Sequence, residues 1–340
     1  MLIHNRRGSF GTHSDSGITI PMCYSAQVEQ ELKTIRNAMK ARVDVASFER
    51  LFKRRLVDDR IKIPKAMEAN FYQPKNSDEE RIHALITEYN AKRSSKLEAE
   101  MFKQRARLVA AEKTLITKTT KKALSDQRIA GNKVKWCSDK IRDIKRTDIK
   151  ISDARIYPFY YASVVIEEGG ERLIRPMRYH CRPNGKPESY DVDYDGLYNA
   201  RRDNLEGFWK NQFGNTHAIV LMTGFYENVA RHDFEHRELA PGEKEENLII
   251  HFNPKPAFQM RVACLWSHWE EKGKEDLDSF AAITDEPPPE VSAAGHDRCI
   301  IPIKESFIDQ WLNPRRKLNS NSYAALDDRE IPKYEHRLAA

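Results

Sequence analysis

Cys23 is the residue of this chain whose type and position most clearly suggest chemistry, because it directly follows Met22. If translation starts at Met22, removal of that methionine leaves Cys23 with a free α-amine beside its thiol. Such a 1,2-aminothiol captures an aldehyde as a five-membered thiazolidine ring. An α-amine has a pKa of about 7.7–8.0 against about 10.4 for lysine, so about a tenth of it is nucleophilic at pH 7. Schiff-base chemistry is therefore open to Cys23 without a buried lysine.

Glu227 and His296 are the candidate proton carriers for that chemistry. A carboxylic acid and an imidazole are suited to moving protons while a carbinolamine loses water and a thiol closes the ring. Glu227 lies at the end of an apolar, strand-like stretch, and His296 lies in a His-Asp-Arg segment. Each residue also has an ordinary structural interpretation: Cys23 as a buried small side chain, Glu227 as a solvated or paired carboxylate, and His296 as a hydrogen-bonded histidine.

Four short segments stand out together, in the order PMCYSAQ (21–27), YNARRDNLE (198–206), LMTGFYENV (221–229) and FAAITDEPPPEVSAAGHDRCIIPI (280–303). In these segments the sequence resembles the SOS response-associated peptidase (SRAP) family. Members of that family carry a Met-Cys start, an Asn-Ala-Arg segment, a Gly-Phe-Tyr-Glu strand end and a His-x-Arg segment in the same order. The resemblance covers Met22 to about Leu56 and about Ile151 to Pro314, and it leaves 57–150 as an insertion.

The resemblance implies a protein of the DNA damage response that detects abasic sites in single-stranded DNA. It implies Cys23 as the crosslinking residue and Asn199 as the residue that positions its amine. Glu227 is implied to assist sugar ring opening and proton transfer, and His296 to assist the Schiff-base step and crosslink reversal. Arg201 is implied to contact a DNA phosphate. Further expected DNA contacts are Arg202, Arg298 and Thr284.

The chain departs from the family pattern at two places that bear on this chemistry. Asn228 stands where the family usually has tryptophan, so the DNA groove is expected to be lined differently. Residues 1–21 precede Met22, and an amide-bonded Cys23 nitrogen cannot form a thiazolidine. We therefore expect that translation starts at Met22 or that a disordered leader, 1–21, is removed by self-cleavage at Cys23.

Two other functions use the same sequence features. The first is a thiol peptidase or self-processing hydrolase, with Cys23 as the nucleophile, His296 as the base and Asn199 as the oxyanion donor. The second is a non-catalytic, basic nucleic-acid-binding protein that binds through its helices. Asn199 also has a structural interpretation, as the cap of a following helix.

Charge is unevenly distributed along the 340 residues, although the net charge is only +6. Residues 22–150 have a net charge of +13 and residues 151–340 a net charge of −8. The first half is therefore the part expected to face a polyanion. DNA binding in the second half must then depend on individual arginines.

Composition also narrows the class of protein and its partners. No apolar run approaches the roughly 20 residues of a membrane span, and the start lacks the apolar core of a signal peptide. The five cysteines are widely spaced without a CxxC pair, which argues against a disulfide framework and a zinc site. We expect a cytoplasmic monomer, associated with the nucleoid when bound to DNA, that needs no metal or cofactor.

Periodicity predicts an α+β fold with a mainly antiparallel, barrel-like β core, in which 22–340 form a single domain. Helical spacing covers 27–56, a helix begins at Ser77, and a second helix covers about Ser95 to Ala130 with Gly131 as its stop. These two helices form a basic hairpin, with Met101, Leu108 and Leu115 in one apolar row and Phe102, Val109 and Ile116 in another. Further helices are expected at 201–212 and 304–312, and strands at 156–166, 172–180, 217–229, 247–254, 258–269 and 280–284.

Overall fold

The structure is a computed structural model that describes residues 25–314 and 320–339. Cys23 and the expected leader lie outside the described residues. The strands are β1 (Ser25–Val28), β2 (Arg42–Val43), β3 (Arg155–Ile156), β4 (Tyr161–Glu168), β5 (Glu171–Tyr179), β6 (Asn199–Arg201), β7 (His217–Ala230), β8 (Asn247–Lys255), β9 (Met260–Trp269), β10 (Leu277–Asp285), β11 (Cys299–Ile300) and β12 (Lys333–Leu338).

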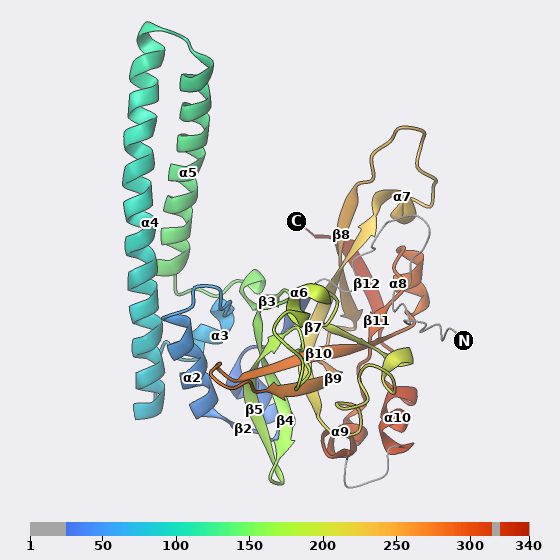
Figure 1. The fold of residues 1–340 in the computed structure, drawn as a ribbon. Coiled ribbons are helices and arrows are strands. Elements are labelled where there is room, and N and C mark those ends of the chain that lie inside the picture. Colours follow the sequence, from blue (N-terminus) through green and yellow to red (C-terminus); the bar gives the residue numbers. More distant parts are fainter. Residues whose placement is uncertain (1–24, 315–319, 340) are drawn as a thin grey trace, which may run out of the picture.

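Helices flank this sheet on several sides (Figure 1). They are α1 (Leu32–Met39), α2 (Val45–Arg55), α3 (Lys65–Ala69), α4 (Ser77–Thr117), α5 (Lys121–Lys145), α6 (Tyr190–Asp193), α7 (Arg231–Phe234), α8 (Pro289–Ala293), α9 (Ile308–Leu312) and α10 (Ser320–Asp327), with 3₁₀ turns η1 (Ile151–Ala154), η2 (Arg202–Asn204) and η3 (Glu305–Phe307). The α+β fold class is confirmed. In the described ranges, no helix combines the length and the apolar character needed to cross a bilayer.

The central strands close into a barrel, because their pairings form a ring. β10 pairs with β5, β5 with β4, β4 with β7, β7 with β9, and β9 pairs with β10 again. Only the β10–β5 step of this ring is parallel. The expected strands are present. Gly169 and Gly170 form the turn between β4 and β5, and both adopt the positive φ that such a turn requires.

Two apolar clusters lie on the two faces of this closed sheet. The inner cluster takes alternate residues of the barrel strands, including Val164, Val220 and Phe280. The outer cluster takes the intervening residues and joins them to helical residues such as Met39 and Phe52. Alternation of side chains along each strand produces this division. The barrel is thus filled inside and covered by helices outside.

The helical hairpin is present, but its boundaries differ from the prediction. α4 continues through the expected break for 41 residues, the turn falls at 118–120, and Gly131 lies inside α5. No glycine or proline interrupts 77–117, and the Thr120 side chain accepts a hydrogen bond from the Ala123 amide to begin α5. A glycine inside a helix costs only about 1 kcal/mol, so Gly131 does not end the helix.

The packed seam of the hairpin agrees with one predicted row and not with the other: Met101, Leu108 and Leu115 are half-buried and alternate along α4 with the buried residues of the seam. Its buried residues on α4 are Leu97, Gln104 and Ala111, and on α5 they are Ala123, Ala130 and Cys137. Each row repeats every seven residues, as in an antiparallel coiled coil. The predicted row of Phe102, Val109 and Ile116 is instead 62–86% exposed. Trp136 of α5 is 40% exposed, and the Lys133 Nζ lies 4.0 Å from its ring centroid.

Two smaller predictions are also corrected. The segment 201–212 forms η2 and irregular turns instead of a helix, because the Asn204 side chain accepts a hydrogen bond from the Phe208 amide and competes with helical pairing. The segment 27–56 contains two helices, α1 and α2, separated by β2. The helix expected at 304–312 is present as η3 followed by α9.

Candidate functional site

Glu227 lies on β7 and points toward the inner cluster. Its neighbours at two-residue spacing, Phe225 and Val229, both belong to that cluster, and Glu227 itself is fully buried. Its partner in the β7–β8 ladder is Ile250. Gly224 explains part of the Gly-Phe-Tyr-Glu segment, because a Cβ atom there would lie 2.7 Å from the Phe252 carbonyl oxygen. The glycine thus allows β8 to approach β7 closely beside Glu227.

A short loop after α8 positions His296 beside Glu227. Gly295 precedes it with a φ of +90°, a conformation that side-chain-bearing residues rarely adopt. A Cβ atom on Gly295 would lie 2.8 Å from Val229 Cγ1, so the loop packs directly against β7. The His296 side chain is consequently almost completely buried.

Glu227 and His296 form a buried ion pair. His296 Nε2 lies 3.0 Å from Glu227 Oε2, and His296 Nδ1 lies 3.0 Å from the Arg298 carbonyl oxygen. Burial alone lowers the pKa of His296, but the Glu227 charge and these hydrogen bonds outweigh it and raise that pKa to about 9. At neutral pH the imidazole is therefore protonated, and its Nε2 faces the Glu227 carboxylate. The pair is equipped to supply a proton to a bound molecule.

Asn199 and Thr284 lie on the neighbouring strands β6 and β10. In this parallel pairing Asn199 is opposite Ala282, and Thr284 is opposite Arg201. Asn199 is buried, and neither its amide nitrogen nor its amide oxygen has a hydrogen-bond partner within the described residues. η2 begins after Arg201, so Asn199 does not cap it. A buried side-chain amide without partners is costly, which is typical of a group kept for a ligand.

The three candidate arginines differ in how strongly their charges are engaged. Arg201 pairs with Asp203 at 2.6 Å, and Arg298 lies 3.8 Å from the same carboxylate, so Asp203 joins the Asn199 strand to the His296 loop. Arg202 instead pairs with Asp285 at 3.0 Å and with Asp327. Asp203 is a residue that sequence reasoning missed, although it lies inside the quoted YNARRDNLE segment.

Arg155 is a second residue that sequence reasoning missed. Its Nε donates a hydrogen bond to Ser25 Oγ at 3.0 Å, and its guanidinium lies 3.5 Å from the ring centroid of Tyr226. The Tyr226 ring also stacks on His251, with centroids 4.0 Å apart. β1 thus enters the sheet beside Tyr226, the residue before Glu227. Arg155 belongs to none of the four quoted segments, so nothing in the sequence pattern marked it.

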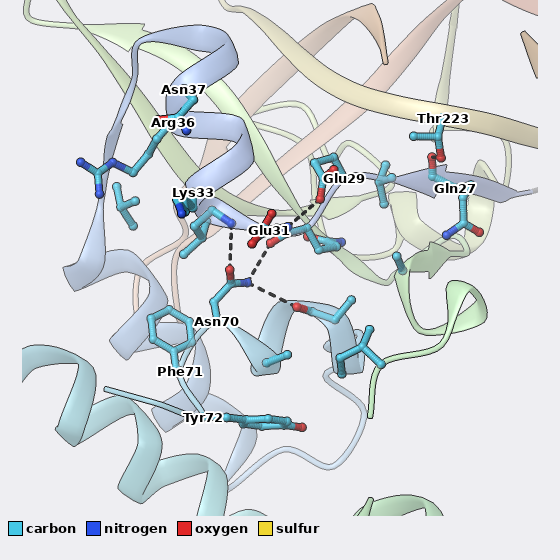
Figure 2. Close-up of a pocket in the computed structure, with 18 of the residues that line it drawn as sticks. Gln27, Glu29, Glu31, Lys33, Arg36, Asn37, Asn70, Phe71, Tyr72 and Thr223 are labelled. Carbon is cyan, nitrogen blue, oxygen red and sulfur yellow. Dashed lines mark hydrogen bonds between the residues drawn. The ribbon is translucent and has the colours of Figure 1, made fainter. Parts of the chain in front are cut away.

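A large cavity of about 1960 Å³ lies on the other face of β1 and β7 (Figure 2). It is lined by Gln27, Thr223 and His251, which alternate with the inward-facing residues of their strands, together with residues of α1 and α3. Asn70 closes one side of it by accepting a hydrogen bond from the Leu32 amide and donating one to the Gln30 carbonyl. This cavity is therefore separated from Glu227 and His296 by the sheet.

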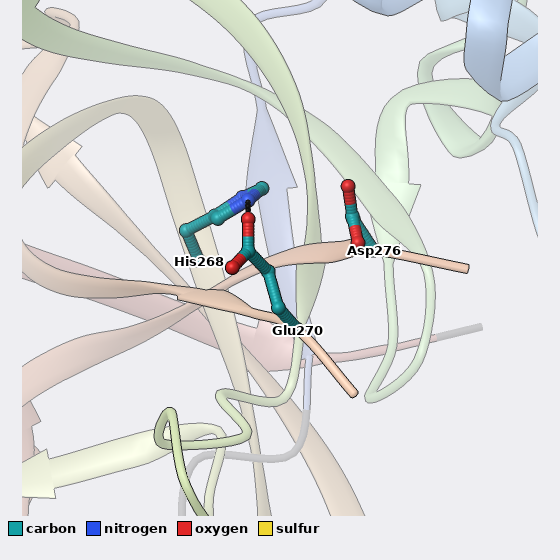
Figure 3. A group of neighbouring side chains, drawn as sticks. All are labelled: His268, Glu270 and Asp276. Atoms are coloured by element: carbon teal, nitrogen blue, oxygen red, sulfur yellow. Dashed lines mark hydrogen bonds and ion pairs between the residues drawn. The ribbon is translucent and has the colours of Figure 1, made fainter. Parts of the chain in front are cut away.

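One group of possible metal ligands occurs in the described part of the chain: His268, Glu270 and Asp276 (Figure 3). His268 Nδ1 lies 2.6 Å from an Asp278 oxygen and Nε2 lies 3.0 Å from a Glu270 oxygen. Partial burial lowers the pKa of His268, but these two carboxylates raise it further than burial lowers it. Both ring nitrogens of His268 are thus occupied by carboxylates of the protein itself, so these side chains form a hydrogen-bonded cluster.

Comparisons with known proteins place this geometry in a family. The chain matches the model of the SOS response associated peptidase (SRAP) family over residues 133–337, which is more than half of its length. The protein belongs to the SRAP family. The matched range contains Asn199, Glu227, His296 and the candidate arginines, whereas Cys23 lies outside it.

Solved structures with a similar arrangement were also found. A protein from Bacteroides thetaiotaomicron has 13% identity and a TM-score of 0.42, and the match covers 55% of this chain and 77% of that one. A protein from Bordetella bronchiseptica has 16% identity and a TM-score of 0.42, with coverages of 55% and 87%. A phage-related protein from the same organism has 16% identity and a TM-score of 0.40, with coverages of 54% and 80%. No curated protein matches the chain.

Proposed function

We propose that this protein senses abasic sites in single-stranded DNA and forms a covalent thiazolidine crosslink to them through an N-terminal Cys23. The observation that carries the proposal is the buried Glu227–His296 pair, in which a carboxylate holds a proton on an imidazole. Selectivity would come from the aldehyde itself, because only a sugar without its base opens to expose one. Membership in an SOS-associated family supports the same function.

The proposed chemistry balances with one water molecule released. The Cys23 amine adds to the aldehyde carbon, and the resulting hydroxyl leaves as water after it accepts a proton from His296. The thiol sulfur then adds to the carbon of the C=N bond and closes the ring, and the thiol proton returns to the imidazole. Glu227 stabilises the imidazolium before it gives up its proton and after it regains one, and it assists opening of the sugar ring.

The covalent connection of Cys23 to β1 supports a position for its amine near Glu227. Cys23 lies two residues before Ser25, so their Cα atoms are held within about 7 Å of each other. Ser25 is paired with Tyr226, which directly precedes Glu227. The unpartnered amide of Asn199 is available to orient the Cys23 amine.

Arginines near this strand end provide the means to bind DNA without reading its sequence. Arg201 and Arg298 share Asp203 and would exchange that carboxylate for a phosphate, whereas Arg202 is held by two carboxylates. Arg155 adds a cation beside Ser25. Phosphate contacts of this kind give salt-dependent affinity, and recognition is left to the aldehyde.

The thiol-peptidase alternative requires His296 to act as a base. A base must be unprotonated when the reaction begins, but the Glu227 charge raises the pKa of His296 to about 9. The ion pair thus favours a proton donor in this position. Cleavage between Met22 and Cys23 by the chain itself would be the distinguishing activity of a peptidase.

The proposal is tested with protein that begins at Cys23 and single-stranded DNA that carries one abasic site. We expect a band that resists denaturation on a gel, and its loss in Cys23→Ser and on DNA whose abasic site has been reduced to the alcohol. Protein that begins at Met1 and whose intact mass shows that residues 1–22 are retained provides the matched control, because its Cys23 nitrogen is an amide. No crosslink from an authentic N-terminal cysteine would refute the proposal.

A further inference from the structure

The outer part of α4 carries an apolar stripe that nothing in the described chain covers. Phe102, Val109 and Ile116 are 65%, 62% and 86% exposed. Together with three other exposed residues they are spaced alternately by three and four positions, in the order Ala99, Phe102, Ala106, Val109, Lys113 and Ile116. This is the a/d pattern of a coiled-coil seam, repeated on a different side of α4 from its seam with α5.

The stripe lies on the part of α4 that projects beyond the barrel (Figure 1). Ion pairs between α4 and the body include Arg81 with Glu49 and end, within the described residues, at Lys96 with Asp59. Farther along, Arg107 pairs only with Asp126 of α5. The stripe begins just after Lys96, so the barrel leaves it accessible to another helix.

We propose that this stripe is the interface for a second copy of the same chain, packed antiparallel along α4. If Ala106 faces Val109 of the second copy, two further pairs follow by symmetry: Phe102 with Lys113, and Ala99 with Ile116. Each alanine then opposes a β-branched residue, which is the alternation of small and large side chains that fills a seam. Phe102 opposes a lysine, an arrangement that permits a cation–π contact.

Charge complementarity favours a second copy of the chain as the partner and an antiparallel arrangement of the two α4 helices. In the same register, Arg105 of each copy lies opposite Glu112 of the other, on both sides of the two-fold axis. Both residues are exposed, and neither has an ion-pair partner within the described residues. In a parallel pairing these two positions would not meet, because flanking residues pair with a different heptad position. The contact spans 18 residues of each helix, or about 27 Å.

The test measures molecular mass in solution by light scattering, on nuclease-treated full-length protein at tens of micromolar concentration. We expect the wild-type protein to approach twice the chain mass of 39.6 kDa. Arg105→Glu and Glu112→Arg should each weaken dimerisation by about tenfold, since each replaces two attractive pairs with two repulsive ones. The double variant R105E/E112R should recover the dimer.

Mixing the two single variants gives the sharpest result. Every Arg105→Glu chain can then pair favourably with a Glu112→Arg chain, so a heterodimer should form with the wild-type affinity from two proteins that each dimerise about tenfold more weakly alone. Arg128→Glu, an equal charge change at an exposed position on α5, is the matched control and should leave the dimer intact. A monomeric wild type, a dimer unaffected by the single reversals, or a dimer lost after nuclease treatment would each overturn the proposal.

Discussion

The end of the barrel and the projecting hairpin use the same kind of side chain in opposite ways. At the barrel, the Glu227 carboxylate is completely buried and has His296 as its partner at 3.0 Å. On the hairpin, the Glu112 carboxylate is exposed and has no ion-pair partner within the described residues. A buried charge controls the protonation of its neighbour, whereas an exposed charge remains available to another molecule. We therefore infer that the barrel carries the proton-transfer site and that the hairpin is suited to contacts with another molecule.

The largest expected difference between the two regions is the effect of removing each carboxylate charge. Glu227→Gln keeps the shape of the side chain but leaves His296 without its counter-ion, and we expect the free energy of unfolding to fall by about 3 kcal/mol. Glu112→Gln should change it by less than about 0.5 kcal/mol. Urea unfolding of both variants at pH 7 measures the contrast. Equal effects from the two substitutions would contradict the assignment of the buried pair.

The pH dependence of stability should sharpen the same contrast. The folded-state pKa of His296, about 9, lies above its unfolded value of about 6.5, so the ion pair stabilises the fold fully below pH 6.5 and less as the pH rises through 9. We expect the stability gap between the wild type and Glu227→Gln to be large at pH 6.5 and to shrink at pH 10. Glu112→Gln should show no such change. If the difference in stability between the wild type and Glu227→Gln instead grew with pH, the pKa of His296 would not be raised in the folded protein.

Substituting alanine for either of two glycines should change the free energy of unfolding by a smaller amount, and in opposite directions. Gly295→Ala must place a side chain at a φ of +90° and against Val229, so it should lower the free energy of unfolding by about 2 kcal/mol. Gly131→Ala lies inside α5 with open space around it and should raise that energy by about 0.5–1 kcal/mol. Thermal unfolding of the two variants tests both signs. Destabilisation by Gly131→Ala would contradict the helical packing of α5.

Much of the barrel could be predicted because its strands carry long apolar runs and its turns carry distinctive residues. β7 was predicted over 217–229 and β5 over 172–180. The helical hairpin was harder. Each of its helices has more than one apolar row, so periodicity alone could not identify the row that packs against the partner helix.

The site could be predicted only as a set of residue types. The quoted segments placed Glu227 and His296 on different elements, but their 3.0 Å contact depends on the positive φ of Gly295 and on the register of β7. The contact of Asp203 with Arg298 and the stacking of Arg155 on Tyr226 join residues far apart along the chain, which local spacing does not reveal. The role of Cys23 remains a prediction.

The smallest expected effect on stability is that of Phe102→Ser, and it separates the two regions most cleanly. Phe102 is 65% exposed and contributes little to the fold of its own chain, so the free energy of unfolding should change by less than about 0.5 kcal/mol when measured in dilute solution. Dimer formation should nevertheless be weakened, because Phe102 is the largest apolar side chain of the interchain seam and packs against Lys113 of the second copy. The proposed crosslinking to abasic DNA should proceed at the wild-type rate, since Glu227 and His296 are untouched. Loss of crosslinking in a folded Phe102→Ser monomer would show that the hairpin and the barrel site are coupled.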